Sequence, residues 1–285
     1  MITNYAELLK KAPSWMYKIG AQTYIDKVYP RHLFLEVTAS CNLSCDYCPR
    51  ERINKHMDFN LFKSIIDEAT HYGPRSFSLH LFGEPLLYPR LWEAITYIKQ
   101  KNKHHTVLLT SNGTLFERYL GELTSSRVDK VIWSWRPEAK FSEATKEKLR
   151  SWGKLTVRMI EEVVPNAERD YWENWPSVEI RKLHTYGGEI SLEKFGAKST
   201  AGTRWACYHL WLAPAVAWNG KFLMCCADPH QKEVFGDINK ETVSESWQRV
   251  EKVRQAHLRG EYEGICKNCD VWKSYPDLFF KFQRT

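Results

Sequence analysis

No stretch of this chain is apolar for long enough to cross a lipid bilayer. The longest strongly apolar stretch, residues 211–218, falls far short of the roughly 20 residues that a membrane-spanning helix needs. No apolar segment of the kind found in secretory signal peptides follows Met1. These two absences predict a soluble, cytoplasmic protein with no membrane partner.

Internal repeats and low-complexity tracts are also absent, so neither a repeat architecture nor extensive disorder is expected. The chain has 285 residues, of which 43% are apolar. That length and composition are enough for one barrel-sized domain with an appendage, or for two modest domains.

The excess of positive charge is small. The chain has 41 basic and 34 acidic residues, a formal net charge of +7. This balance favours anionic ligands, nucleic acid among them, without requiring one. A generally charged, solvated surface explains the same excess. Retention of DNA or RNA that weakens with added salt would separate the two interpretations.

Eight cysteines are present, and they are clustered along the chain. An even number is compatible with the disulfide bonds of a secreted protein. The short spacings suit metal ligation in a reducing compartment better. We therefore interpret the cysteines as metal ligands and expect an oxygen-sensitive protein.

Strand-like and helix-like segments alternate through the first two thirds of the chain. The predicted strands are short apolar runs, and the predicted helices have apolar residues three or four positions apart. The expected strands cover residues 32–38, 76–82, 106–110, 130–135, 154–160 and 178–183, and the expected helices cover residues 58–72, 90–101, 115–123, 142–152 and a segment from residue 166. Such alternation predicts a parallel sheet with right-handed crossovers and an active site at the carboxyl ends of the strands.

Three cysteines, Cys41, Cys45 and Cys48, lie in the run CNLSCDYC directly after the first expected strand. A 4Fe-4S cluster has four iron sites, so three thiolates can hold it and leave one iron open to another molecule. Zinc is the alternative, although local zinc sites usually use Cys-x2-Cys pairs. The run resembles the Cys-x3-Cys-x2-Cys motif of the radical S-adenosylmethionine (radical SAM) superfamily, with the aromatic Tyr47 before the last cysteine.

This resemblance implies a fold, cofactors and a reaction. Family members are partial (β/α)6 barrels, TIM-like α/β folds whose six units match the number predicted for this chain. Their open iron binds S-adenosyl-L-methionine, which one electron cleaves to a 5′-deoxyadenosyl radical. An external donor such as flavodoxin or ferredoxin supplies that electron. By resemblance, Cys41, Cys45 and Cys48 are the catalytic cluster ligands.

The segment after the second expected strand resembles a cofactor-binding motif of the family. Gly83, Glu84 and Pro85 match its Gly-Gly-Glu-Pro motif, which meets the methionine amino end of the cofactor, and Phe82 replaces the first glycine. Because a glycine there permits close approach of two backbones, the replacement bears on local backbone shape. By itself the tripeptide would indicate only a turn. His80, earlier in this strand, is interpreted as a core histidine.

Three further positions resemble family residues. Ser111 and Asn112, after the third strand, match a segment that contacts the ribose or the methionine carboxylate of the cofactor. Ser134 matches a serine often followed two positions later by Asp, where this chain has Arg136. Arg136 either holds an anionic group through paired hydrogen bonds or is a surface charge. Arg158 resembles a residue that pairs with the cofactor carboxylate, and an ordinary strand-edge charge is the alternative.

A second group of cysteines lies in the last third of the chain. Its expected ligands are Cys207, Cys225, Cys266 and Cys269. With a hairpin signal at residues 218–222 and the loop FGDIN, they resemble the SPASM or shortened twitch module of radical SAM proteins. Such modules hold auxiliary 4Fe-4S clusters, and four ligands support one. Cys226 is either the fallback for Cys225 or a buried thiol, and a four-cysteine zinc ribbon is the alternative for the whole module.

The expected organisation has three parts. They are an N-terminal cap with a short helix (residues 1–30), a radical SAM partial barrel (31–185) and a small cysteine-rich α+β module of SPASM or twitch type (186–285). The last part is expected to begin with a connector rich in Gly, Ser, Thr and Lys and to contain an amphipathic helix over residues 243–258.

A cluster held by four cysteines cannot bind the cofactor, so electron transfer is its natural use, and this argues for net oxidation. We expect a radical SAM oxidoreductase, similar to twitch-type aminocyclitol dehydrogenases, that takes hydrogen from a carbon of a polar small molecule. Radical modification of a ribosomal peptide is a second hypothesis, although the residues before the first strand are too few for a winged-helix recognition domain. A nucleotide or nucleic acid substrate is a third. A non-enzymatic scaffold would release no 5′-deoxyadenosine.

Overall fold

Nine strands form one sheet in the part of the chain that the computed structural model describes, residues 26–50, 53–197, 206–212 and 214–271. The strand order is β6-β5-β4-β3-β2-β1-β7-β8-β9. The strands are β1 (His32–Leu35), β2 (Ser76–Ser78), β3 (Thr106–Ser111), β4 (Lys130–Ser134), β5 (Leu155–Ile160), β6 (Val178–Arg181), β7 (Ala215–Val216), β8 (Lys221–Leu223) and β9 (Val234–Asp237).

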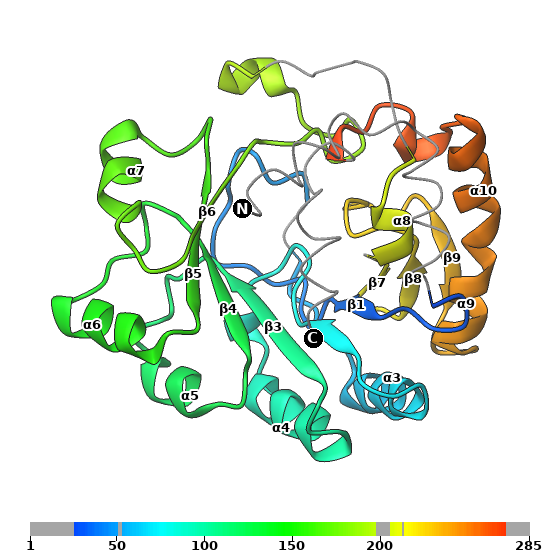
Figure 1. Cartoon of the computed structure of the whole chain (residues 1–285), viewed down its shortest axis with the longest axis horizontal. Coiled ribbons are helices and arrows are strands. Elements are labelled where there is room, and N and C mark those ends of the chain that lie inside the picture. Colours follow the sequence, from blue (N-terminus) through cyan, green and yellow to red (C-terminus); the bar gives the residue numbers. More distant parts are fainter. Residues whose placement is uncertain (1–25, 51–52, 198–205, 213, 272–285) are drawn as a thin grey trace, which may run out of the picture.

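The first six strands pair in parallel, each with its neighbour in the sequence. Helices connect most of them: α3 (Phe59–His71), α4 (Leu91–Lys101), α5 (Leu120–Ser125), α6 (Glu143–Trp152) and α7 (Asn166–Trp172). Figure 1 shows these helices along the outside of the curved, open sheet. The predicted α/β partial barrel is therefore confirmed. The helix expected in the N-terminal cap lies outside the described residues.

Alternating side chains give the six parallel strands two different faces. On the helix side, apolar residues such as Leu35, Leu109 and Val157 belong to one large buried cluster. Because successive side chains of a strand point to opposite faces, intervening residues such as Thr110 and Arg158 lie on the inner face. The inner face carries the polar residues at the carboxyl ends of the strands, where the predicted site lies.

The helix ends follow their local sequence. Asp58 caps α3 by accepting hydrogen bonds from the amides of Asn60 at 2.8 Å and Leu61 at 3.0 Å. Ser142 caps α6, which ends at Gly153 with a φ of +72°. An N-cap acceptor and a C-terminal glycine satisfy backbone groups that have no partner within the helix. The predicted bounds of these two helices agree with the structure to within one residue.

Two predicted helices differ from the structure. The helix expected over residues 115–123 begins only at Leu120, because the buried Phe116 lies in a turn whose amide donates to the Gly113 carbonyl at 3.0 Å. The helix expected over residues 243–258 is two helices, α9 (Val243–Arg249) and α10 (Glu251–Arg259), which meet at Val250.

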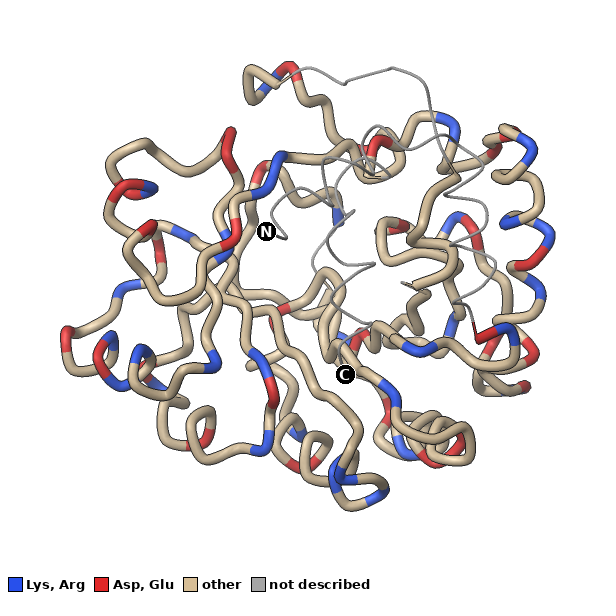
Figure 2. Tube along the Cα trace, viewed as in Figure 1, with Lys and Arg blue, Asp and Glu red and all other residues tan. Residues whose placement is uncertain are grey.

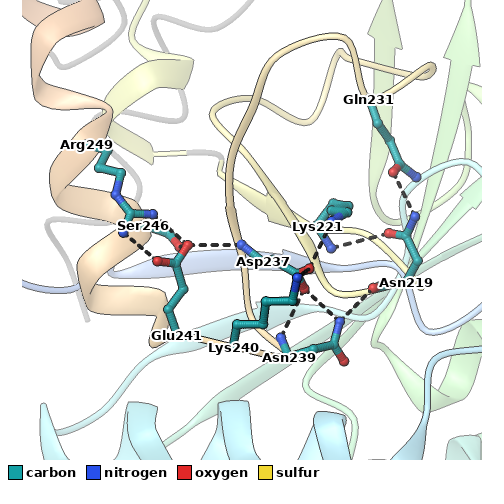
Figure 3. A network of polar contacts seen from close by, with 9 residues as sticks. All are labelled: Asn219, Lys221, Gln231, Asp237, Asn239, Lys240, Glu241, Ser246 and Arg249. Atoms are coloured by element: carbon teal, nitrogen blue, oxygen red, sulfur yellow. Dashed lines mark hydrogen bonds and ion pairs between the residues drawn. The ribbon is translucent and has the colours of Figure 1, made fainter.

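The C-terminal segment extends the sheet of the barrel. β7 pairs in parallel with β1, and β8 and β9 continue antiparallel. The predicted hairpin is confirmed, with Gly220 at a φ of +85°. The segment FGDIN, predicted as a loop, is in part a strand, because its first three residues belong to β9 and pair with β8. It packs against α9 through a polar network (Figure 3), in which the Glu241 carboxylate accepts from the Asp237 amide at 3.0 Å and pairs with Arg249. A Cβ on Gly236 would lie 1.9 Å from the Ser246 hydroxyl oxygen, so this segment needs glycine.

Direct hydrogen bonds join the barrel to the C-terminal segment. Glu68 of α3 accepts from the amides of Val243 and Ser244, both at 2.9 Å, at the start of α9. Thr185, just after β6, donates its amide and its hydroxyl to Asp270, at 2.8 and 2.9 Å. The start of α9 and the chain around Asp270 are thereby fixed to the barrel. Among the described residues, no helix is long and apolar enough to span a membrane.

Candidate active site

The first three predicted ligands lie in one loop after β1. Cys41, Cys45 and Cys48 are all half-buried, so the loop is accessible to a cofactor. The Cys48 amide donates to the Cys45 carbonyl at 3.0 Å, which turns the chain between these two thiols. Burial raises the pKa of the Tyr47 hydroxyl, and the Arg136 guanidinium lies 4.9 Å from the centre of its ring.

A buried ion pair that was not predicted from the sequence holds this loop. Arg50 pairs with Glu36 at 2.9 Å, with side chains 7% and 0% exposed. Glu36 follows β1 and also accepts from the amide of Trp218, which follows β7, at 3.3 Å. Burial raises the pKa of Glu36 to about 7, against the opposing effect of Arg50. The signal in the sequence was a charged residue within the apolar run HLFLEVT.

The predicted Gly83-Glu84-Pro85 motif lies against the start of the cysteine loop. A Cβ on Gly83 would lie 2.1 Å from the Thr38 carbonyl oxygen. The Glu84 amide donates to the Ser40 carbonyl at 2.8 Å, and Pro85 begins a short 3-10 helix. The backbone approach that the motif predicted is present, although Phe82 replaces the first glycine.

The Glu84 side chain points into the protein. It accepts from the Ser111 hydroxyl at 2.8 Å and from the Asn112 amide at 2.7 Å. Burial raises its pKa to about 7. Glu84 thus joins the loops after β2 and β3.

The Asn112 side chain reaches the cysteine loop. Its amide nitrogen lies 3.9 Å from the Cys41 sulfur and donates to the Asn42 carbonyl oxygen at 2.9 Å. Asn42 in turn donates to the Thr114 hydroxyl at 2.7 Å, and this hydroxyl donates to Asn112. The ring of three polar side chains links the loops after β1 and β3. Asn42 and Thr114 were not among the predicted residues.

Ser134 and Arg158 lie side by side because their strands are in register. Arg158 is opposite Glu179 of β6 and donates to it at 2.8 Å. The Ser134 hydroxyl accepts from Arg136 at 3.1 Å. Arg158 therefore belongs to a charged network on the inner face and is more than a strand-edge charge.

Tyr186, in the loop after β6, lies between the two groups of cysteines. Burial raises the pKa of its hydroxyl, and the nearby Cys48 and Cys226 raise it further. Its backbone has a φ of +46°, which is rare for a residue other than glycine. The Phe82 ring packs edge-on against it at 5.9 Å. This contact accounts for the replacement of the first motif glycine by Phe82.

The predicted ligands of the second group come together in the C-terminal segment. Burial raises the pKa of Cys207, and the nearby Cys225, Cys269 and Cys266 raise it further. Burial and Cys225 raise the pKa of Cys269 to about 11. Two of the sulfurs accept backbone hydrogen bonds. The Ala227 amide donates to the Cys225 sulfur at 3.3 Å, and the Gly187 amide donates to the Cys269 sulfur. Three of these thiols are buried and Cys269 is half-buried. Neighbouring thiols that disfavour ionisation of Cys207 and Cys269 are a donor set suited to a cation.

The spacing of these sulfurs bears on the zinc alternative. Tetrahedral zinc, with Zn–S bonds of about 2.3 Å, requires its sulfurs about 3.8 Å apart. In the described part of the chain, the potential ligand atoms that gather within 4.8 Å of one another are those of His209, Cys225 and Cys226. The sulfurs of the four predicted ligands, Cys207, Cys225, Cys266 and Cys269, do not all lie that close to one another. They fit a larger iron–sulfur cube better than a single zinc ion.

Two other predicted residues lie at the edge of the site. The Cys226 sulfur lies 3.5 Å from Nδ1 of His209, on the side of Tyr186. His80 accepts from the Thr110 amide at 3.2 Å, and burial lowers its pKa to about 3. His80 is half-buried on the inner face, so the predicted core position is only partly enclosed.

Comparison with known families matches both halves of this arrangement. A model described as the radical SAM superfamily matches residues 35–132, and one described as an iron–sulfur cluster-binding domain, SPASM, matches residues 207–270. These matches assign residues 35–132 to the radical SAM superfamily and residues 207–270 to the SPASM domain. Both families bind 4Fe-4S clusters, and the two matches contain all seven cysteines that were predicted as ligands.

Individual relatives are similar over different lengths. A probable GTP 3′,8-cyclase of Methanococcus maripaludis is 35% identical over 105 residues, 35% of this chain and 35% of that protein. The S-adenosyl-L-methionine-dependent 2-deoxy-scyllo-inosamine dehydrogenase of Niallia circulans is 26% identical over 258 residues, 86% of this chain and 94% of that protein. The first match is confined to about a third of each chain, whereas the second extends through the C-terminal segment.

A solved structure supports the fold over nearly the same extent. The crystal structure of BtrN in complex with AdoMet and 2-DOIA superimposes with a TM-score of 0.65 at 21% identity. The alignment covers 86% of this chain and 98% of that chain. At this identity the likeness establishes a shared fold, including the small module after the partial barrel.

Proposed function

We infer that this protein is a radical SAM oxidoreductase that oxidises a polar small molecule. A cluster held by Cys41, Cys45 and Cys48 supplies, when bound, the electron that cleaves S-adenosylmethionine to a 5′-deoxyadenosyl radical. That radical takes a hydrogen atom from a substrate carbon. The substrate radical then loses one electron to the auxiliary cluster and one proton to a base or to water, so the substrate is oxidised by two electrons.

The observation that carries this proposal is the position of Tyr186. The Tyr186 hydroxyl is within electrostatic reach of Cys48 from the first loop and Cys226 from the second group. The segment that follows it also touches the auxiliary site, because the Gly187 amide donates to the Cys269 sulfur. A substrate beside Tyr186 would lie between the radical source and the electron acceptor.

The residues around the first loop would hold the cofactor in place. The Gly83 and Glu84 backbone and the Asn112 side chain all contact the loop that carries the three cysteines. These contacts fix the shape of the cysteine loop before a cofactor binds, which lowers the entropy cost of ordering the loop on binding. Ser134 and Arg158 are the side chains proposed to meet the ribose or carboxylate end.

The comparisons and the charge distribution bear on the alternatives. One relative that matches along most of the chain is named as a 2-deoxy-scyllo-inosamine dehydrogenase, which favours a small-molecule substrate over a peptide. Basic and acidic residues are interspersed along the outer helices (Figure 2), which gives little support to nucleic acid. None of the eight cysteines, all within the described residues, forms a disulfide, so a reducing compartment with a flavodoxin or ferredoxin donor suits the protein.

The two cysteine groups should have separable functions. In anaerobically reconstituted protein with S-adenosylmethionine and dithionite, Cys45→Ala should abolish 5′-deoxyadenosine formation, because the first cluster loses a ligand. Cys266→Ala should retain cofactor cleavage but stop substrate oxidation, because the electron has no acceptor. Chromatography of 5′-deoxyadenosine and of the product measures both.

Cys226→Ala is the comparison variant, since it removes the fallback thiol, which is not one of the four preferred ligands. We expect it to keep about eight irons per chain, the count for two cubes. If Cys45→Ala and Cys266→Ala lose the same activities, the proposed division between the clusters is wrong. If the wild-type protein releases no 5′-deoxyadenosine, the proposed function is wrong.

A further inference from the structure

Three arginines lie near the carboxyl ends of β4, β5 and β6, with one carboxylate among them. We call Arg136, Arg158 and Arg181, together with Glu179, the arginine cluster. Strand register places Arg158 opposite Glu179, and Arg181 lies two residues after Glu179, on the same face of β6. The family resemblance had indicated a role for Arg158 alone.

One carboxylate is shared by two of these arginines. Nε of Arg158 donates to one oxygen of Glu179 at 2.8 Å, and Nε of Arg181 donates to the other at 2.5 Å. The side chains of Arg158, Glu179 and Arg181 are 20%, 29% and 13% exposed. Three charged groups are thus held together in a mostly enclosed place, with the two guanidiniums on one counter-ion.

The three charged groups act strongly on one another. Burial and the neighbouring Arg158 lower the pKa of Arg181 to about 10. Burial would raise the pKa of Glu179, but the two arginines outweigh it and lower the pKa to about 2. Glu179 is therefore a carboxylate shared by two guanidiniums, and an anionic group that brings further oxygen acceptors would be favoured beside them.

Arg136 adds a second cation with an unused donor. One of its terminal nitrogens donates to the Trp135 carbonyl at 2.6 Å and to the Ser134 hydroxyl at 3.1 Å. Its Nε is buried and has no hydrogen-bond partner among the described residues. No ion pair there includes Arg136. Two carboxyl groups lie in its vicinity. Burial raises the pKa of Glu84 to about 7, and the Glu84 oxygens are already used by Ser111 and Asn112. Glu138, two residues after Arg136, acts on the same Tyr47 hydroxyl as Arg136 does.

The arginine cluster faces the proposed reaction site. Both Arg158 and Arg136 act electrostatically on the Tyr186 hydroxyl, as does Cys48 of the first loop. Arg158 also acts on His80 of the inner face. An anion held by these arginines would therefore lie beside Tyr186, between the two groups of cysteines.

We propose that Arg136 and Arg181 of the arginine cluster bind a carboxylate or phosphate group of the substrate, so that the substrate is an anionic small molecule. The proposal rests on the proposed function. Guanidinium groups match planar carboxylate and phosphate oxygens in paired hydrogen bonds, and Glu179 fixes the orientation of Arg158 and Arg181. The carboxylate of S-adenosylmethionine is the other source of the same chemistry, and the test must separate the two.

Inorganic phosphate is the probe. It is titrated by calorimetry into the anaerobically reconstituted protein, with and without saturating S-adenosylmethionine. We expect phosphate to bind in both conditions. Arg181→Gln and Arg136→Gln should each weaken phosphate binding to the cofactor-loaded protein by about tenfold or more, the effect of losing one charged hydrogen bond. Arg150→Gln, at an exposed position of α6, is the matched control and should leave it unchanged.

Two results would overturn the proposal. If S-adenosylmethionine abolishes phosphate binding, the anion that the cluster holds is the cofactor's own. If Arg181→Gln and Arg136→Gln bind phosphate as the wild type does, the cluster is not an anion site. Cluster absorbance checks that each variant is folded. If Arg181→Gln is not folded, Arg181→Lys, which keeps the charge but lacks the paired guanidinium nitrogens, replaces it. Release of 5′-deoxyadenosine, measured separately, tests the proposed function independently.

Discussion

At the scale of single residues, Gly83 is a position where an added side chain would meet the backbone of a neighbouring segment. A Cβ there would lie 2.1 Å from the Thr38 carbonyl oxygen and 2.9 Å from that of Ser40. Both neighbours are backbone atoms of the segment that leads into Cys41, so the cysteine loop itself would have to move.

We therefore expect Gly83→Ala to reduce 5′-deoxyadenosine formation by about 100-fold, the effect of displacing a catalytic group by about 1 Å. Gly121→Ala is the control, because Gly121 lies in α5 with nothing within 4 Å of its added Cβ. It should leave activity unchanged. Initial rates at saturating S-adenosylmethionine give the comparison, and equal rates for both variants would show that the close approach has no role.

The sequence predicts residues that act through spacing and misses those that act through contacts between distant segments. The triplet of Cys41, Cys45 and Cys48 is local, so its spacing alone indicated a cluster. The pair between Glu36 and Arg50 joins two loop positions whose proximity depends on the fold. Tyr186 became a candidate only when the fold brought it near both cysteine groups.

At the scale of elements, the contact between α3 and the start of α9 joins the barrel to the C-terminal segment. Glu68 accepts two amide hydrogen bonds there, each at 2.9 Å. Free amides and the positive end of the helix dipole favour a carboxylate at this place. Glu68 thus acts as an N-terminal cap supplied by another helix.

Replacing this cap should loosen the C-terminal segment. Glu68→Ala removes both bonds, and we expect a loss of about 2 kcal/mol of stability, or about 5 °C in Tm for a chain of this size. Differential scanning calorimetry of the reconstituted protein measures it. Glu147→Ala removes an exposed carboxylate of α6 and should change Tm by less than about 1 °C. A Tm of Glu68→Ala equal to this control would refute the capping role.

The division of the predicted C-terminal helix also has a cause that the sequence does not reveal. Arg254 of α10 is 1% exposed and lies 3.7 Å from the centre of the Trp247 ring of α9. Its guanidinium donates to the carbonyls of Leu210 and Trp247, at 2.9 and 3.3 Å. Burying an arginine at the end of α9 lets the chain turn at Val250. Apolar periodicity runs through this point, so it predicted one helix.

At the scale of the whole molecule, one sheet joins the two predicted parts. The order of β1 to β6 followed from the alternation of strands and helices in the sequence, because parallel crossovers place consecutive strands side by side. The pairing of β7 with β1 connects residues far apart in the sequence, and no local sequence pattern predicts it. It brings the auxiliary cysteines to the open side of the barrel, which is why the site depends on both parts.

The interior of this sheet makes the whole fold sensitive to acid. His32 lies on the inner face between the hydroxyls of Ser76 and Ser78, 3.0 Å from each, and burial lowers its pKa to about 4. Because this value is below the ordinary histidine value of about 6.5, the unfolded chain takes up the proton first. The stabilisation is complete above pH 6.5 and is lost as the pH falls toward 4.

At pH 5.5 this single histidine should cost about 1.4 kcal/mol of folding free energy relative to pH 8. His32→Asn keeps a polar side chain but cannot titrate, so its stability should fall by about 1.4 kcal/mol less than that of the wild type over this interval. Anaerobic urea unfolding of both proteins at the two pH values measures the difference. Parallel pH profiles would mean that His32 is already charged in the folded protein, or is equally neutral when the chain unfolds.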